Sequence, residues 1–393
     1  MAAAQRLGLG IVVASEGEHA LVGDLAGGVH VRLGASGAAE RLVEVARRPG
    51  CAAVVATDDR TVELASITAR ALLLPHNAPE AVHLSRRKDL ARAVLARAGL
   101  PVPPFRVLDL ARALRPQLGG LDYPCVVKPV ALSGSRGVIR VESEVELLAA
   151  SRRVRRILAE VADLEERDRL LVEDFIPGPE LALEGLLDDG ELQVLALFDK
   201  PDPLDGPFFE ETYYVTPSRL GAGTQALVAW RVQEACRAYG LVQGPVHAEV
   251  RLWDGDAWIL EVAARTIGGQ CARLLRFGTG RGLEDLVLAQ AAGMPLDLTP
   301  PAEAAGVLMI PTPEAGVLRR VEGVLAARRV PYVEDVEISV REGYRLVPLP
   351  EGSSYLGFIF ARAPSPLLAE QALREAHAKL RVVTAPLLAV AAG

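Results

Sequence analysis

Short apolar runs and amphipathic stretches alternate over the first 84 residues. The apolar runs are rich in valine and isoleucine, as buried strands are, and the amphipathic stretches repeat their apolar positions with a helical period. In chain order the predicted elements are strands at residues 11–14 and 29–33, a helix at 40–48, a strand at 52–57 and a helix at 60–74. Strands that alternate with helices favour a parallel sheet, so residues 1–84 are predicted to form an α/β domain.

The pattern changes over residues 85–300, where hairpins are expected beside longer helices. Ser85 is expected to cap a helix over residues 86–97 that stops before Gly99. Asp254-Gly255, between two apolar runs, is a strong hairpin-turn signal. A first hairpin is predicted within residues 123–141, followed by a helix at 144–166, strands at 170–173, 180–187 and 192–198, a helix at 222–239, strands at 246–253 and 257–262, and a helix at 283–292. We expect about residues 120–200 to form a lid subdomain of this region.

Two prolines, Pro300 and Pro301, mark the start of a smaller third region. Strands are predicted there at residues 307–310, 334–340 and 355–361, and a helix is predicted to begin at Pro366. Residues 301–393 therefore favour a small α+β domain. The fold class predicted for the whole chain combines α/β and α+β architecture.

Composition and charge exclude several classes of function. The 393 residues carry a net charge of −7 without long single-sign blocks, so no nucleic-acid partner is expected. The apolar stretches are too short to cross a bilayer, and the N-terminus is a poor signal peptide. The four cysteines lack the spacing of a zinc site or a disulfide framework. We therefore expect a cytoplasmic protein with reduced thiols and no membrane association.

Lys128 ends an apolar run and is followed by a loop of small residues, Ser133-Gly134-Ser135-Arg136-Gly137, and by a second β-rich run. Glycines let backbone N–H groups approach phosphate oxygens closely, and the lysine adds a positive charge. The hairpin tip is therefore a candidate phosphate site. It is not a P-loop, because the lysine precedes the glycines and β structure follows them. The alternative is a flexible surface hairpin with a stray lysine.

Two glutamates are predicted to face each other across a second hairpin. Strand alternation places His247, Glu249 and Arg251 on one face, and Glu261 and Arg265 on one face of the neighbouring run. Antiparallel pairing brings the two glutamates side by side, where they repel each other unless a cation lies between them. Such hard oxygen ligands suit Mg²⁺. The alternative is a pair of solvated glutamates on a half-exposed sheet.

A strand that ends near Glu173 breaks at Pro177-Gly178-Pro179 and resumes at Glu180. A hinge of this kind exposes backbone N–H and C=O groups to the edge of a base, while Glu180 can accept hydrogen bonds from ribose hydroxyls. The alternative is an ordinary loop with solvated acids.

Taken in chain order, these pieces resemble the ATP-grasp superfamily of carboxylate–amine (or thiol) ligases over about residues 85–300. The resemblance rests on Lys88, on Lys128 with the loop Ser133, Gly134, Ser135, Arg136 and Gly137, on Glu173, Asp174, Phe175, Ile176 and Glu180, and on Glu249, Glu261 and Arg265. It implies an ATP-grasp fold with a leading α/β domain. It also implies that ATP and Mg²⁺ are bound, with Mn²⁺ as an alternative ion.

The resemblance assigns a role to each of these groups. The two lysines would contact ATP phosphates, the Ser133–Gly137 loop would close over the triphosphate, residues 173–176 would hold adenine, and Glu180 would bind ribose. Glu249 and Glu261 would coordinate the metal ion, and Arg265 would steady an acylphosphate or a tetrahedral intermediate. Arg265, Lys128 and Glu211 are the expected catalytic residues.

Within the superfamily the chain looks most like the L-amino-acid (dipeptide) ligases. Residues 208–218 are similar to that group's run of Phe, Glu, Thr-Gly-His and Pro-Ala/Ser. Tyr214 stands where many members carry histidine, which implies an altered amino-acid pocket. Ala263 stands where many ATP-grasp enzymes carry a metal-binding asparagine, so the resemblance supports one Mg²⁺ site better than two.

The implied activity joins a carboxylate, such as that of an amino acid, to an amine through an acylphosphate, with release of ADP and phosphate. The expected partners are the two small-molecule substrates, and a homodimer is the family expectation. Lys200 and Glu211 are candidates for the acceptor side, with a solvated or packed strand residue as the alternative for each, and Cys271 is interpreted as a packed thiol. One rival is an ATP-grasp carboxylase-type enzyme, biotin-carboxylase-like or of the purine pathway, that phosphorylates bicarbonate. The other is a non-catalytic nucleotide-binding sensor.

Overall fold

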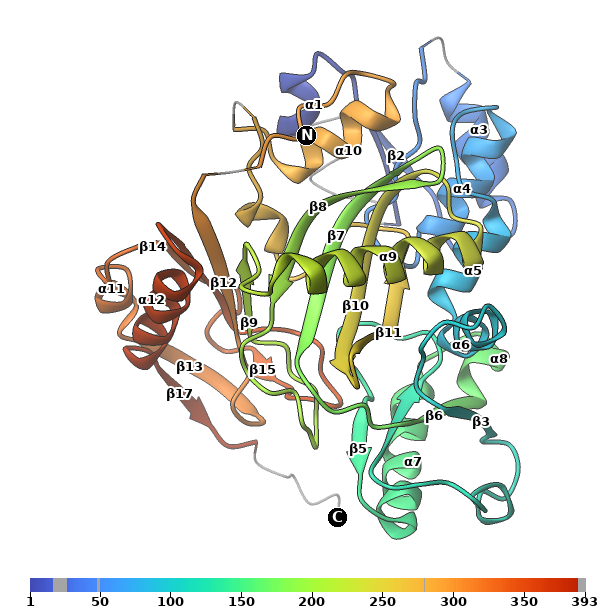
Figure 1. The fold of residues 1–393 in the computed structure, drawn as a ribbon, viewed down its shortest axis with the longest axis vertical. Helices are drawn as coiled ribbons and strands as arrows, with labels where there is room; N and C mark the ends of the chain where they lie inside the picture. Colours follow the sequence, from blue (N-terminus) through green and yellow to red (C-terminus); the bar gives the residue numbers. More distant parts are fainter. Residues whose placement is uncertain (17–26, 48–49, 279, 301, 388–393) are drawn as a thin grey trace.

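An eight-stranded antiparallel sheet forms the centre of the protein (Figure 1). The structure is a computed structural model, and it describes residues 1–393 apart from 17–26, 48–49, 279, 301 and 388–393. In spatial order the strands of this sheet are β11 (Asp256–Ala263), β10 (Gly244–Trp253), β7 (Glu180–Asp188), β8 (Glu191–Asp199), β9 (Tyr213–Thr216), β12 (Ala304–Ile310), β16 (Gly357–Ala363) and β14 (Val333–Ile338).

Both faces of this sheet are covered by helices. Figure 1 shows α9 (Ala222–Tyr239) lying across strands β7, β10 and β11. Its apolar residues pack with those of α5 (Pro79–Arg86) and α6 (Lys88–Arg97) in one hydrophobic core. The opposite face packs against the short helix η2 (Cys271–Leu274) and α10 (Leu283–Ala291) in a second core. Both faces of the sheet are thus close-packed, which makes the sheet a firm support for a binding site.

A second, four-stranded antiparallel sheet lies beside one end of the central sheet. Its spatial order is β3 (Phe105–Asp109), β6 (Arg169–Asp174), β4 (Cys125–Pro129) and β5 (Ile139–Val141). Helix α7 (Glu144–Leu158) packs on it, and α8 (Leu164–Arg167) and the 3₁₀ turn η1 (Arg115–Gln117) lie in its connections. The small sheet holds the predicted hairpin of Lys128, because β4 and β5 pair in antiparallel register.

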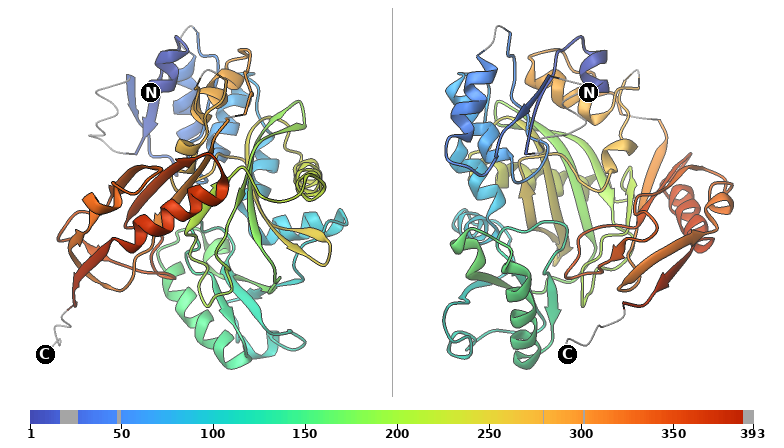
Figure 2. Two further views of the ribbon diagram at one scale, coloured as in Figure 1. Left: turned by 60° about the vertical axis from the view of Figure 1, so that its left-hand side comes forward. Right: turned by 180° about the vertical axis from the view of Figure 1, so that it is seen from behind.

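The C-terminal region extends the central sheet. Strands β12, β14 and β16 join it through β9, and α12 (Pro366–Ala378) packs against them in a third hydrophobic core. A three-stranded sheet lies on the far side of α12, with α11 (Val324–Ala327) before it; its strands are β15 (Arg345–Leu346), β13 (Gly316–Glu322) and β17 (Arg381–Ala385). Seen from behind in Figure 2, this region lies opposite the N-terminal residues and the small sheet.

The N-terminal region contains α1 (Ala2–Arg6), a parallel pair of strands β1 (Val12–Ser15) and β2 (Gly27–His30), α3 (Ala38–Ala46) and α4 (Val62–Ala71). The parallel pairing predicted here is confirmed. The predicted strand at residues 52–57 is wrong: the segment forms no strand, and Val54 and Val55 instead line a small cavity. Strand propensity without a hydrogen-bonded neighbour does not make a strand.

Two predicted helix boundaries are also wrong. Ser85 caps no helix, because Pro79 already begins α5 and Ser85 lies in its last turn, where its hydroxyl donates to the Val82 carbonyl at 2.8 Å. Arg87 is extended between α5 and α6. The predicted helix at 144–166 is two helices, since α7 ends at Leu158 and Asp163 caps α8.

Candidate active site

A cavity of about 400 Å³ opens where the small sheet, strands β10 and β11, and the C-terminal region meet. Residues 57–59 of the N-terminal region complete one wall, and Met309, Ser353 and Tyr355 complete another. The predicted site residues that line it are Lys88, Lys128, Ser133, Gly134, Ser135, Glu173, Asp174, Phe175, Ile176, Glu180, Glu211, Glu249, Glu261 and Arg265. The fold therefore brings into one cavity residues that lie as much as 177 positions apart (Lys88 and Arg265) in the sequence.

Of the predicted nucleotide-site residues, Arg136 and Gly137 are not among those that line the cavity, and neither is Lys200, a candidate for the acceptor side. The Arg136 guanidinium donates to the Glu351 carbonyl at 2.9 Å and pairs with Glu160 at 2.7 Å. The Gly137 N–H donates to the Pro350 carbonyl at 2.9 Å. In this structure both residues therefore tie the loop to the C-terminal region, and only Ser133, Gly134 and Ser135 face the cavity.

Lys128 is held by a buried carboxylate. Its ammonium pairs with Glu173, whose other oxygen lies 2.6 Å from the Arg92 guanidinium. Burial lowers the pKa of Lys128 below its ordinary value. Burial alone would raise the pKa of Glu173, but Arg92 and Lys128 outweigh it and keep that carboxyl ionised. The Glu173 side chain thus positions Lys128, and Arg92 is a member of the site that sequence reasoning missed.

Glu249 and Glu261 are direct partners in the register of β10 and β11, as the hairpin predicted. Leu260 is an extra residue on β11, because the register shifts between Glu249 and Val250. The Glu249 carboxylate lies 3.0 Å from the Lys200 ammonium, and Glu261 lies 3.1 Å from that of Lys88. Two carboxylates beside a cavity lined by lysines form a donor set that fits Mg²⁺ with a bound phosphate chain.

Lys200 is the centre of a buried ionic cluster. Its ammonium contacts Glu180 and Glu211 at 2.7 Å each and Glu249 at 3.0 Å, and its side chain is 3% exposed. Burial alone would lower the pKa of Lys200, but the three carboxylates raise it well above its ordinary value. The other Glu180 oxygen accepts from Arg251 at 3.0 Å, so both oxygens of this carboxylate already have cationic partners.

Glu211 lies beside Glu249 in this cluster. Burial raises the pKa of Glu211 to about 7, against the opposing effect of Lys200. The pKa of Glu249 is instead held well below its ordinary value, although burial opposes this, because Lys200 and His247 favour its ionised form. His247 links Glu249 to the fully buried Glu184, with nitrogen–oxygen distances of 3.7 and 3.4 Å.

Arg265 lies just beyond the end of β11 and faces the cavity. Its Nε donates to Asp59 at 2.7 Å, and one terminal nitrogen donates to the Thr266 carbonyl at 3.0 Å. Burial opposes its charge, but Asp59 raises the pKa of Arg265 above its ordinary value. Arg265 is thus a fixed cation, with one hydrogen-bonding edge held by the N-terminal region.

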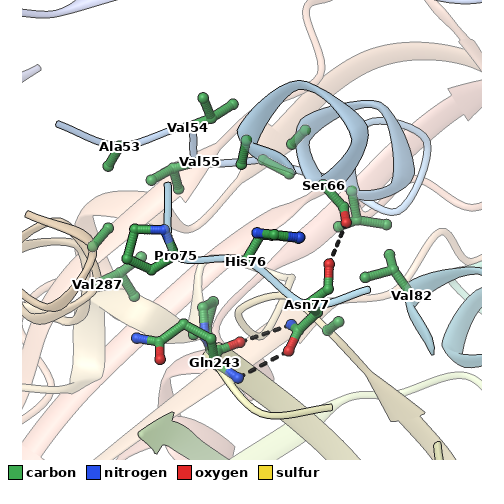
Figure 3. A pocket seen from close by; sticks show the side chains of 18 of the residues that line it. Ala53, Val54, Val55, Ser66, Pro75, His76, Asn77, Val82, Gln243 and Val287 are labelled. Carbon is green, nitrogen blue, oxygen red and sulfur yellow. Dashed lines mark hydrogen bonds between the residues drawn. The ribbon is translucent and has the colours of Figure 1, made fainter. Parts of the chain in front are cut away.

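A smaller cavity of about 100 Å³ lies between the N-terminal region and the start of β10 (Figure 3). Its walls are mostly alanine and valine, and the polar members are Ser66, His76, Asn77, Gln243 and Gln290. The Asn77 side chain donates to the Gln243 carbonyl at 2.7 Å and accepts from the Gln243 N–H at 2.8 Å. None of the predicted site residues lines this cavity, so the larger one is the candidate active site.

Two parts of the chain match models of known protein families, and the whole fold resembles a solved structure. An ATP-grasp domain model matches residues 121–273, and a model of the L-amino acid ligase C-terminal domain 2 matches residues 308–385. The structure of an L-amino acid ligase from Bacillus licheniformis superposes with a TM-score of 0.85 at 28% identity, covering 98% of this chain and 95% of that one.

Two curated relatives are similar over part of the chain. Carnosine synthase 1 of Gallus gallus is 29% identical over 74% of this chain and 33% of its own length. A D-alanine–D-alanine ligase of Desulforudis audaxviator is 34% identical over 46% of this chain and 58% of its own length. The chain thus spans less than two-thirds of either relative.

The matched models and the superposed ligase agree with the fold class predicted from the sequence, which is confirmed. No helix among the described residues is both long and apolar enough to cross a bilayer. The chain thus contains an ATP-grasp domain over residues 121–273, followed by an L-amino acid ligase C-terminal domain 2 over residues 308–385, and over nearly its whole length it is similar to a solved L-amino acid ligase.

Proposed function

We propose that this enzyme joins the carboxylate of an amino acid to the amine of a second substrate, with conversion of ATP to ADP and phosphate. One observation supports this proposal above the others. Two lysines, a paired set of carboxylates and a fixed arginine face one cavity: Lys88, Lys128, Glu249, Glu261 and Arg265. Transfer of a phosphoryl group requires charge neutralisation and positioning more than covalent chemistry, and this set supplies both.

Each group of residues in the cavity has its own role in the proposed reaction. Lys88 and Lys128 neutralise phosphate charge, and the amides of Ser133–Ser135, which line the cavity, would donate to phosphate oxygens. The carboxylate oxygen of the first substrate attacks the terminal phosphorus, and ADP leaves. The amine then attacks the resulting acyl carbon and releases phosphate. Arg265, held at Asp59, stabilises the oxyanion that forms in the second step.

Glu249 and Glu261 would hold Mg²⁺, which supplies charge neutralisation at the phosphate chain. The backbone of residues 174–176 would hold adenine beside the apolar side chains of Val126, Leu204 and Phe209, which line the same cavity. The carboxylate of Glu180 is already bound by Lys200 and Arg251, so it would accept ribose hydroxyls as a fixed anion.

The test is phosphate release from ATP, screened over pairs of amino acids, with mass spectrometry of the products. We expect release that requires both amino acids and a product whose mass is the sum of the two minus water. Release that bicarbonate stimulates, and amino acids do not, would favour the carboxylase-type alternative. ATP binding without ADP formation under any pair would favour a nucleotide sensor.

A further inference from the structure

One part of the cavity wall, beside Glu211, is built of neutral side chains. It consists of Tyr214, Cys271, Met309 and Tyr355, and we call it the apolar wall. The first three are at most 2% exposed and belong to one hydrophobic core, against which Tyr355 packs. They come from β9, η2, β12 and the segment before β16. Four separate segments thus fix the shape of this wall.

The apolar wall is a poorly hydrated environment. Burial raises the pKa of Tyr214, Cys271 and Tyr355 above their ordinary values, and the nearby Glu211 carboxylate raises them further. All three groups are therefore neutral at pH 7. A charged group placed against such a wall loses its hydration and gains no partner, which carries a large free-energy cost.

The charges nearest to the wall are already paired. The Lys200 ammonium lies 4.9 Å from the centre of the Tyr214 ring, but it is bound by three carboxylates. An acidic side chain at the wall would find no unpaired cation there among the described residues and would lie beside the Glu211 carboxyl group. A basic side chain would have to compete with Lys200 for the same carboxylates.

We infer that the apolar wall receives the side chain of an amino-acid substrate, so that the enzyme selects aliphatic, thioether or aromatic side chains over charged ones. The inference rests on the proposed function and names its substrate class. Met309 limits the size of that side chain. Met309 lies against Gly269: a Cβ atom built on that glycine would be only 2.2 Å from the Met309 sulfur. The Met309 side chain therefore packs directly on the backbone at Gly269, in the wall of the cavity.

The experiment compares phosphate release by the wild-type enzyme and by Met309→Ala and Met309→Leu. The tested amino acids are leucine, methionine, phenylalanine, tryptophan, aspartate and lysine, each with the same second substrate. We expect the wild type to favour the best apolar amino acid over aspartate and lysine by at least about 10-fold in kcat/KM. Met309→Ala should raise the ratio of tryptophan to leucine several-fold, whereas Met309→Leu, which conserves volume, should keep the wild-type ratio.

The outcomes separate the two proposals. If amino acids stimulate release but aspartate or lysine is used as well as leucine, the inference is overturned and the proposed function stands. If no amino acid stimulates release, both fail. If Met309→Ala is folded by circular dichroism and keeps the wild-type preference, Met309 does not set the size limit. The KM for ATP should stay within about twofold in both variants, because Met309 lies outside the residues proposed to hold the nucleotide.

Discussion

Asp59 of the N-terminal region holds Arg265 of the ATP-grasp domain through a 2.7 Å hydrogen bond across 206 residues of sequence. Asp59 is therefore a positioning residue for the cation that we propose at the reacting carbonyl. The contact also explains why the N-terminal region contributes to the cavity, since residues 57–59 line it.

Asp59→Asn should lower kcat by about 10- to 100-fold and change the KM for ATP little. A displaced Arg265 would stabilise the transition state less, whereas it contributes little to nucleotide binding. Steady-state kinetics with ATP as the varied substrate measure this. Asp58→Asn is the matched control. Asp58 accepts from the N–H groups of Arg60 and Thr61 in the turn before α4, and asparagine makes the same turn contacts. Equal losses in both variants would argue against the positioning role.

Glu261→Ala should abolish turnover and leave the protein folded, because only one carboxylate of the proposed Mg²⁺ site remains. Phosphate release and circular dichroism report the two properties. Glu191→Ala, at a side chain that is 74% exposed, should keep wild-type activity. Wild-type turnover in Glu261→Ala would refute the metal assignment.

Lys200→Met should destabilise the protein by about 3–5 kcal/mol, because it leaves the buried Glu180 and the partly buried Glu211 and Glu249 without their shared cation. Urea unfolding measures the loss. Lys379→Met removes an ion pair between side chains that are 46% and 56% exposed, and it should cost less than about 1 kcal/mol. If the two variants lose equal stability, the cluster does not depend on Lys200.

Glu351→Ala should loosen the loop at Ser133–Gly137. The Glu351 carboxylate binds Arg153 of α7 at 2.5 and 2.8 Å, close to the contacts that Arg136 and Gly137 make with the same segment. We expect faster amide hydrogen exchange in residues 133–137, with a change in unfolding free energy below about 1 kcal/mol because the pair is half exposed. Unchanged exchange would show that the backbone contacts alone hold the loop.

Only Cys51 of the four cysteines is exposed, so it alone should react rapidly with an aromatic disulfide reagent at pH 8. Burial raises the pKa of Cys125 and of Cys236 to about 12, and that of Cys271 rises well above its ordinary value, so their thiolate forms are scarce at this pH. Cys51→Ser should remove the rapid phase. A second rapid thiol that maps to Cys271 would contradict its assignment as a packed side chain.

Sequence reasoning succeeded where the signal is local. The Asp254-Gly255 turn predicted the hairpin of β10 and β11, whereas the bulge at Leu260 that brings Glu249 opposite Glu261 had no sequence signal. The ionic cluster around Lys200 had no local signal, because its carboxylates come from three strands or loops that only the folded chain assembles. Asp59 did carry a signal, as an acid that follows an apolar run, but its partner lies in another region.

The errors have the same origin. Residues 52–57 have the composition of a strand, yet strand formation depends on a neighbour that the sequence does not specify. The backbone of residues 173–176 and the Glu180 carboxylate stay predicted nucleotide contacts, but sequence reasoning did not find the role of the Glu173 side chain, which holds Lys128 and Arg92. A carboxylate's partner depends on tertiary packing, which periodicity does not encode.

The continuity of the central sheet through β9 and β12 limits how this protein can be engineered. Deleting everything after the proline pair would strip the hydrogen-bonding partner from β9 and leave an open edge ready to pair with other chains. It would also remove Met309 and Tyr355 from the cavity. Replacing the C-terminal third with that of a relative would therefore change part of the substrate pocket and part of the hydrophobic core at once. The junction of a chimaeric protein should be placed at another position in the chain.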